Sequence, residues 1–94
     1  LLLLERVMRA MLDKIREAIQ KPLQEMNIVV DSIEYVKDGS YYFLNIVLDR
    51  VNGLDLDTVV EATNIINPIL DDLDLIEESY ILDVSSKERD DQDE

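Results

Sequence analysis

The sequence contains no cysteine, histidine or tryptophan and has only two glycines. Without cysteine the chain has no disulfide, thiolate nucleophile or cysteine-based metal site, and without histidine it lacks the commonest metal ligand. Two glycines are too few for a phosphate-binding loop. No run reaches the roughly 18 apolar residues that a membrane span needs, and the leucines at residues 1–4 are too few for a signal peptide. These absences favour an intracellular, non-enzymatic protein and predict neither a membrane span nor a cofactor.

Basic residues are scarce, and the net charge of −13 is unevenly distributed. Residues 1–27 hold five basic and four acidic residues, whereas residues 28–86 hold two basic and thirteen acidic ones. Direct, sequence-specific binding to nucleic acid is not expected, because contact with phosphates needs clustered Lys and Arg. The acidity either keeps the protein soluble or attracts a basic partner.

The hydrophobic pattern of this 94-residue chain predicts a single domain of five elements. Apolar residues at three- and four-residue spacing predict helices over residues 5–26 and 55–73, and alternating apolar residues predict strands over 28–37, 40–49 and 79–85. A small sheet with one strongly apolar face needs a cover, which two amphipathic helices supply. The expected fold is α+β, a two-layer α/β sandwich in the order α-β-β-α-β, with both helices on one face of a three-stranded sheet.

Each predicted helix contains a proline. Pro22 should kink the first helix or end its regular part, whereas Pro68 lies on the solvent side of the second, where a bend is enough. Asp55 is placed to cap the second helix. The methionine-containing stripe of the first helix favours a core over a partner groove. The buried stripe predicted for the second helix is Val59, Thr63, Ile66, Leu70 and Leu73.

The strand pairing is predicted from the turns. Asp38-Gly39 indicates a two-residue hairpin loop, and Asn52-Gly53 indicates the next turn. Asp31, the one polar residue on the apolar face, is interpreted as a strand-edge residue or a bulge. The pairs predicted for the helix-covered face are Tyr35–Tyr42, Ile33–Leu44, Asp31–Ile46 and Val29–Leu48, and those for the opposite face are Val30–Val47, Ser32–Asn45, Glu34–Phe43 and Val36–Tyr41.

No catalytic or metal site is predicted. The densest acidic cluster, Asp71 to Glu78, has no glycine and lacks the ligand spacing of a calcium loop. Ser85-Ser86 has no histidine or other base to activate it. The uncovered sheet face, half apolar and rimmed by acids, is instead the expected partner-binding site. Its candidate residues are Tyr41, Phe43, Val47, Glu34, Asp49, Asp55, Asp57 and Asp83.

A family resemblance rests on motifs spread over residues 5–87. They are Pro22-Leu23, Asp31 with Glu34 to Lys37 and Gly39, Leu48-Asp49, Gly53 with Leu56-Asp57, and Tyr80 with Leu82 to Ser86. In this order the motifs resemble the N-terminal domain of the ribosome maturation factor RimP. That family usually continues from its final Ser-Ser through Pro-Gly into a second, β-barrel domain. Here Ser85-Ser86 is followed by KERDDQDE, so residues 1–86 are expected to form a single RimP-like domain with an acidic disordered tail at 87–94. The β-barrel is expected to be absent, either because the chain is a degenerate, single-domain relative or because that domain has been left out. Asn67-Pro68 also departs from the family pattern.

The resemblance implies a function as well as a fold. RimP-like proteins assist maturation of the small (30S) ribosomal subunit in the bacterial cytoplasm without catalysing a reaction. The expected partners are therefore the small-subunit precursor and a basic ribosomal protein, bound by a monomer. The alternative is an acidic protein-binding adaptor of another pathway that shares the fold.

Overall fold

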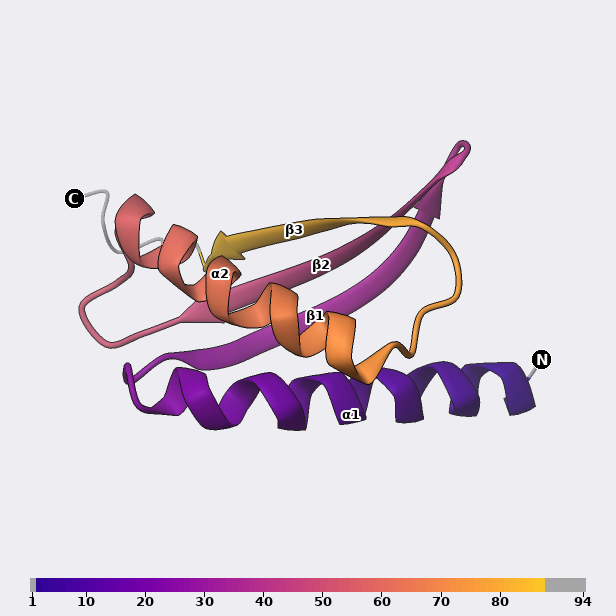
Figure 1. Ribbon diagram of the computed structural model, residues 1–94, viewed down its shortest axis with the longest axis horizontal. Helices are drawn as coiled ribbons and strands as arrows, with labels where there is room; N and C mark the ends of the chain where they lie inside the picture. The colour runs from indigo at the N-terminus through magenta and orange to yellow at the C-terminus, as the bar shows by residue number, and fades with distance from the viewer. Residues whose placement is uncertain (1, 88–94) are drawn as a thin grey trace.

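The computed structural model describes residues 2–87. Five elements follow one another along this part of the chain (Figure 1). The order α-β-β-α-β and the α+β fold are confirmed. The elements are α1 (Leu2–Gln24), β1 (Val29–Asp38), β2 (Tyr41–Asp49), α2 (Leu56–Leu73) and β3 (Tyr80–Ser86).

The strands form one sheet in the order β1-β2-β3, with β2 in the centre. β1 runs antiparallel to β2, which a short hairpin loop allows, whereas β3 runs parallel to β2. Parallel neighbours need a long crossover, and α2 supplies it. Figure 1 shows α1 and α2 side by side along the curved sheet.

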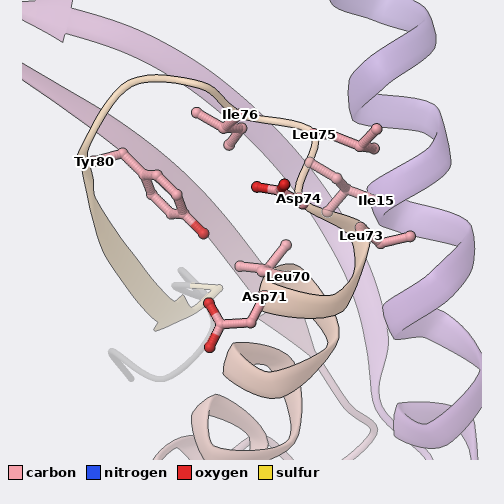
Figure 2. Close-up of a pocket in the computed structure, with 8 residues that line it drawn as sticks. All are labelled: Ile15, Leu70, Asp71, Leu73, Asp74, Leu75, Ile76 and Tyr80. Atoms are coloured by element: carbon pink, nitrogen blue, oxygen red, sulfur yellow. The ribbon is translucent and has the colours of Figure 1, made fainter.

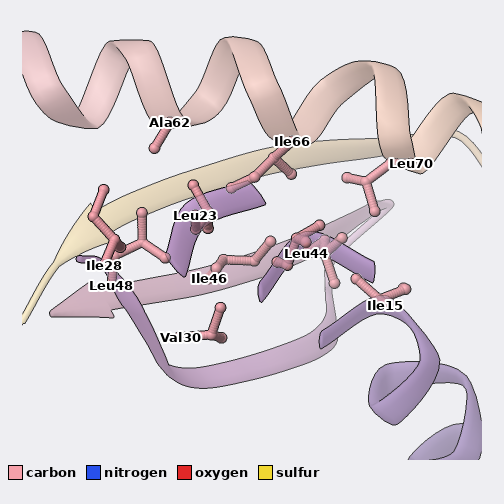
Figure 3. Packing of buried hydrophobic residues seen from close by; sticks show 11 residues of the cluster. Ile15, Leu23, Ile28, Val30, Leu44, Ile46, Leu48, Ala62, Ile66 and Leu70 are labelled. Carbon is pink, nitrogen blue, oxygen red and sulfur yellow. The ribbon is translucent and has the colours of Figure 1, made fainter. Parts of the chain in front are cut away.

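The core lies between the helices and one face of the sheet (Figure 3). Leu44, Ile46 and Leu48 point to this face from alternate positions of β2, and each is 0% exposed. Every third or fourth residue of the helices packs onto them. The helical residues buried in the core are Ile15, Ile19 and Leu23 from α1 and Ala62, Ile66 and Leu70 from α2.

Helix α1 begins at Leu2, three residues before the predicted start, and ends at Gln24 rather than 26. Pro22 lies in its last turn, so the missing backbone donor affects only the end of the helix. The chain then turns through Asn27, whose φ of 62° is left-handed. The N–H of Ile28 donates to the Leu23 carbonyl over 3.1 Å and closes this turn.

Helix α2 has the predicted cap. The Asp55 side chain accepts a hydrogen bond from the Thr58 N–H over 2.9 Å. At the other end Asp74 adopts a left-handed conformation (φ 50°) and its N–H donates to the Leu70 carbonyl over 3.0 Å. Pro68 is exposed, as predicted. Of the predicted buried stripe, Ile66 and Leu70 are buried, whereas Val59, Thr63 and Leu73 are partly exposed. Ala62 is also buried, although it was not predicted to be.

The predicted register of the hairpin is wrong by two residues. Asp38 pairs with Tyr41, so the loop is Gly39-Ser40 rather than Asp38-Gly39. Gly39 alone of the two loop residues has a positive φ, 65°, the arrangement typical of a turn with glycine at its first central position. Because side chains alternate with a period of two, this shift keeps most side chains on their predicted faces. The observed pairs are Lys37–Tyr42, Tyr35–Leu44, Ile33–Ile46, Val36–Phe43, Glu34–Asn45 and Ser32–Val47.

The start of β1 is the exception, because a bulge interrupts the ladder between Val30 and Ser32. Asp31 is the extra residue, which confirms its interpretation as a bulge. One extra residue exchanges the two faces for the residues before it. Val30, predicted on the uncovered face, is therefore in the core and 4% exposed, and Val29, predicted inside, is 52% exposed.

Because Ile66 lies at the centre of the core, its truncation should be costly. Ile66→Ala should lower the free energy of unfolding by about 2–5 kcal/mol, because it leaves a cavity under the sheet. Thermal and urea unfolding followed by circular dichroism would measure this. Val60→Ala, at a 52% exposed position of the same helix, is the matched control and should cost much less. Equal costs for both variants would contradict the observed phase of α2.

The cap of α2 gives a pH-dependent prediction. Hydrogen bonds from Thr58 lower the pKa of Asp55, so its stabilising effect is present above the unfolded pKa of about 3.9 and is lost as the pH falls through the lower folded value. Asp55→Ala should therefore lower the melting temperature near neutral pH, and the difference from wild type should shrink in acid. Asp57→Ala, which removes an acid from the same turn but no cap, should have the smaller effect at neutral pH.

Candidate functional site

The sheet face turned away from the helices is formed by alternate residues of all three strands. We call it the open face. Paired residues on neighbouring strands lie side by side, so the face is built of rows that cross the sheet. Its residues are Val29, Ser32, Glu34, Val36 and Asp38 of β1, Tyr41, Phe43, Asn45, Val47 and Asp49 of β2, and Ile81, Asp83 and Ser85 of β3.

One row of the open face is entirely apolar. Phe43 on the central strand pairs with Val36 on one side and Ile81 on the other. Val36 is 40% exposed and Ile81 46% exposed, and Phe43 between them is half-buried. Tyr41, next along β2, is 63% exposed. This apolar row gives the open face an aromatic centre that is accessible from solvent.

The next row is acidic. Glu34 and Asp83 flank Asn45, and both carboxylates are exposed. The row after it places Val47 between two serines, Ser32 and Ser85. The open face therefore sets two negative charges directly beside its apolar row. Such an arrangement suits a partner that buries an apolar group and carries positive charge around it.

An ion pair links β1 to the residue that follows β3, at the end of the sheet opposite the hairpin. The Lys87 Nζ lies 3.3 Å from Oδ1 of Asp31, the bulge residue. The Lys87 N–H also donates to the Leu48 carbonyl over 2.7 Å. Both charged side chains are partly exposed, so the pair adds little stability. Lys87 is the first residue of the predicted tail, and residues 88–94 lie outside the described part of the chain.

The structure brings six of the eight predicted partner-binding residues to the open face. They are Glu34, Tyr41, Phe43, Val47, Asp49 and Asp83. Asp55 and Asp57 instead begin α2 in the helix layer, where Asp55 serves as the cap. The two outer members of the apolar row, Val36 and Ile81, were not among the candidates. The alternation of each strand showed that they face outward, but only the observed register and strand order place them on either side of Phe43.

An aromatic cluster lies on the covered side of the same strands, near the hairpin. The rings of Tyr35 and Tyr42 stack with centroids 5.5 Å apart, and the Lys37 Nζ lies 5.8 Å from the Tyr42 ring centroid. The Tyr35 hydroxyl donates to Oε1 of Glu78 over 2.9 Å. Burial, reinforced by this bond, raises the pKa of Tyr35 to about 12. The bond ties the hairpin to the loop that leads into β3.

A small hollow lies where α2 ends (Figure 2). Its volume is about 90 Å³, well below the roughly 300–1,000 Å³ of pockets that enclose small organic ligands. Burial, and after it the neighbouring Asp71 carboxylate, raises the pKa of Tyr80 at its edge. Two carboxylates, Asp71 and Asp74, line the hollow. Its lining residues are Ile15, Leu70, Asp71, Leu73, Asp74, Leu75, Ile76 and Tyr80.

A shallow groove runs between α1 and β1. Met8 and Leu12 of α1 and Ile33 of β1 supply its apolar surface, and Arg9 and Asp13 are among its charged lining residues. The other two methionines of the predicted stripe, Met11 of α1 and Met26 just beyond its end, pack against the core. The predicted core role thus holds for most of the stripe, and Met8 is the methionine that lines the groove.

Residues 2–87 contain neither a metal-binding cluster nor a membrane-spanning helix. No group of three or more acidic side chains within this range could hold a metal ion. Neither of its two helices is long and apolar enough to cross a membrane.

The raised pKa of Tyr35 predicts how stability changes in alkali. An unfolded tyrosine ionises near pH 10, whereas folded Tyr35 holds its proton to about 12. Its contribution is therefore complete below pH 10 and is lost as the pH rises towards 12. Absorbance titration at 295 nm should show a late ionisation step that Tyr35→Phe removes. Tyr41→Phe should leave that step in place, and its loss in the Tyr41 variant instead would contradict the assignment.

Comparison with known families agrees with this architecture. The family model described as the RimP N-terminal domain matches residues 18–87, which is 70 of the 94 residues. The match begins within α1 and covers the sheet, α2 and the residue that follows β3. It includes every residue of the open face. The chain therefore belongs to the RimP N-terminal domain family of ribosome maturation factors.

Proposed function

We propose that this chain is a non-enzymatic ribosome assembly domain that aids maturation of the small (30S) subunit in the cytoplasm. In this proposal it acts as a monomer and binds a basic ribosomal protein through the open face. Family membership supplies the general role. The observation that carries the binding mode is the apolar row around Phe43, left uncovered by the helices and set beside Glu34 and Asp83.

The two parts of the open face have different tasks. Apolar and aromatic side chains at the centre of an interface supply most of its affinity, because they lose contact with water. Charges at the rim mainly increase the association rate and orient the partner. Phe43 has the central position, and Glu34 and Asp83 have the rim positions.

The charge of the chain selects the class of partner. A protein of net charge −13 repels RNA phosphates and attracts proteins rich in Lys and Arg. Proteins that will bind ribosomal RNA are of this second kind. The acids would cover positive side chains until RNA phosphates replace them, so the domain would hold such a protein before it joins the subunit.

The apolar part of the proposal is tested with Phe43→Ala. Purified small-subunit ribosomal proteins would be passed over the immobilised chain, and we expect the tightest binder to dissociate at least about tenfold faster from the variant, because a central anchor contributes about 2 kcal/mol or more. Val60→Ala truncates an equally apolar but remote side chain on α2 and should leave dissociation unchanged. Melting curves verify that both variants are folded. Unchanged dissociation from folded Phe43→Ala would remove the open face as the site.

The electrostatic part is tested with a double charge reversal, Glu34→Lys with Asp83→Lys. Association should slow and its dependence on salt should flatten, because two attractive charges beside the contact become repulsive. Glu61→Lys with Asp72→Lys changes the net charge equally at exposed positions of α2 and should have the smaller effect. If both double variants slow association equally, only net charge matters. Equal binding to unrelated basic proteins would favour a general adaptor over a ribosomal role.

A further inference from the structure

The sheet has two outer strands, and their unpaired edges differ. A strand edge offers a row of backbone N–H and C=O groups to which another strand can add. Side chains of α1 occupy part of the β1 edge. Gln20 donates from Nε2 to the Ile28 carbonyl over 2.9 Å, and its Oε1 accepts from the Val30 N–H over 2.9 Å. Arg16 donates from Nη1 to the Val30 carbonyl over 2.9 Å.

These contacts close the start of the β1 edge. The Gln20 side-chain amide offers one donor and one acceptor, as a neighbouring strand would, and thereby takes the place of one. The bulge at Asp31 then interrupts the regular spacing that an added strand needs. Farther along, exposed Glu34, Lys37 and Asp38 place charges of both signs on β1. Side-chain clamps, bulges and charges are common means of protecting an edge.

Within residues 2–87 the edge of β3 has neither a side-chain clamp nor a bulge, and its one charged residue is Asp83. Tyr80–Ser86 pairs in an unbroken parallel register with β2, without a bulge. No hydrogen bond in this range reaches the backbone of β3 from outside the sheet. The strand contains neither glycine nor proline, and Tyr80, Ile81 and Val84 give it strong β-propensity. It is therefore an extended edge whose backbone groups are available to another chain.

Charge decides what can occupy this edge. Residues 51–86, which include all of α2 and β3, contain nine acidic residues and no Lys or Arg. Asp83 projects from β3 itself, and Asp71 lies near Tyr80 at its start. A second copy of the chain would bring an equally acidic edge against this one, and like charges on facing strands repel. A strand rich in Lys or Arg would instead be attracted by these carboxylates.

We propose that the outer edge of β3 binds an extended, Lys- or Arg-rich segment of a partner protein as a fourth strand of the sheet. Backbone hydrogen bonds would hold the segment, and Asp71 and Asp83 would attract its positive side chains. The inference goes beyond the proposed function, because the edge site uses the β3 backbone rather than the apolar row and requires no ribosomal partner. A segment bound there would also widen the open face beside Ile81.

The probe is a blocked eight-residue peptide of alternating lysine and valine, and its control is the same peptide with every backbone nitrogen methylated. Methylation keeps the charge but removes the donors that strand pairing needs. NMR-detected amide exchange would report the site. At ten times the Kd, outward amides of residues 80–86 should exchange about tenfold more slowly, and those of residues 32–38 should not change. The methylated peptide should give no protection.

Charge-reversal variants test the choice of partner. Asp71→Lys with Asp83→Lys should weaken peptide binding strongly at low salt, whereas Asp13→Lys with Glu17→Lys, an equal change at exposed positions of α1, should weaken it less. Equal binding of the methylated peptide, or protection of β1 instead of β3, would overturn the proposal. Peptide-induced shifts confined to the open face would do the same. The peptide has no ribosomal sequence. A negative result with it would therefore count only against the β3 edge site, whereas the test with ribosomal proteins and Phe43→Ala judges the proposed function separately.

Discussion

The alternation of side chains along β2 is the constraint on which the molecule depends. One set of its residues, Leu44, Ile46 and Leu48, is fully buried beneath the two helices. The intervening set includes Phe43 and Val47 and forms the centre of the open face. A displacement of β2 by one residue would exchange the two sets and place the core in water. Stability and the proposed binding surface are therefore fixed by the same strand, and a change in its register would destroy both.

Much of this arrangement follows from sequence patterns alone. The order of elements, the cap at Asp55, the exposed Pro68 and the central burial of Ile66 were predictable, because each depends on local chemistry or on a periodic pattern. The hairpin register was not, because Asp38-Gly39-Ser40 accommodates a two-residue loop in either of two frames. A shift of two residues leaves the faces unchanged, so hydrophobic alternation cannot choose between the frames.

Other features needed the three-dimensional structure. The bulge at Asp31 was one of two interpretations, and only the observed pairing shows that it moves Val30 into the core. The position of β3 beside β2 could not be read from its own sequence, because the partner of a parallel strand is set by the crossover through α2. Consequently the row of Val36, Phe43 and Ile81 could not be assembled beforehand. The sequence alone shows that the α1 segment is nearly balanced in charge and that the α2–β3 half is acidic. Only the strand order shows that the acidic half includes one edge of the sheet.

The clamp that Gln20 makes on β1 has a consequence for how the domain opens. Helix α1 covers the core and, through this one amide, also occupies backbone groups of Ile28 and Val30 that would otherwise be unpaired. Detachment of α1 therefore exposes apolar surface and a strand edge in a single event. Partial opening at this end would produce a species with both features that promote aggregation, so cooperative folding of the helix onto the sheet protects the chain in dilute and crowded solution alike.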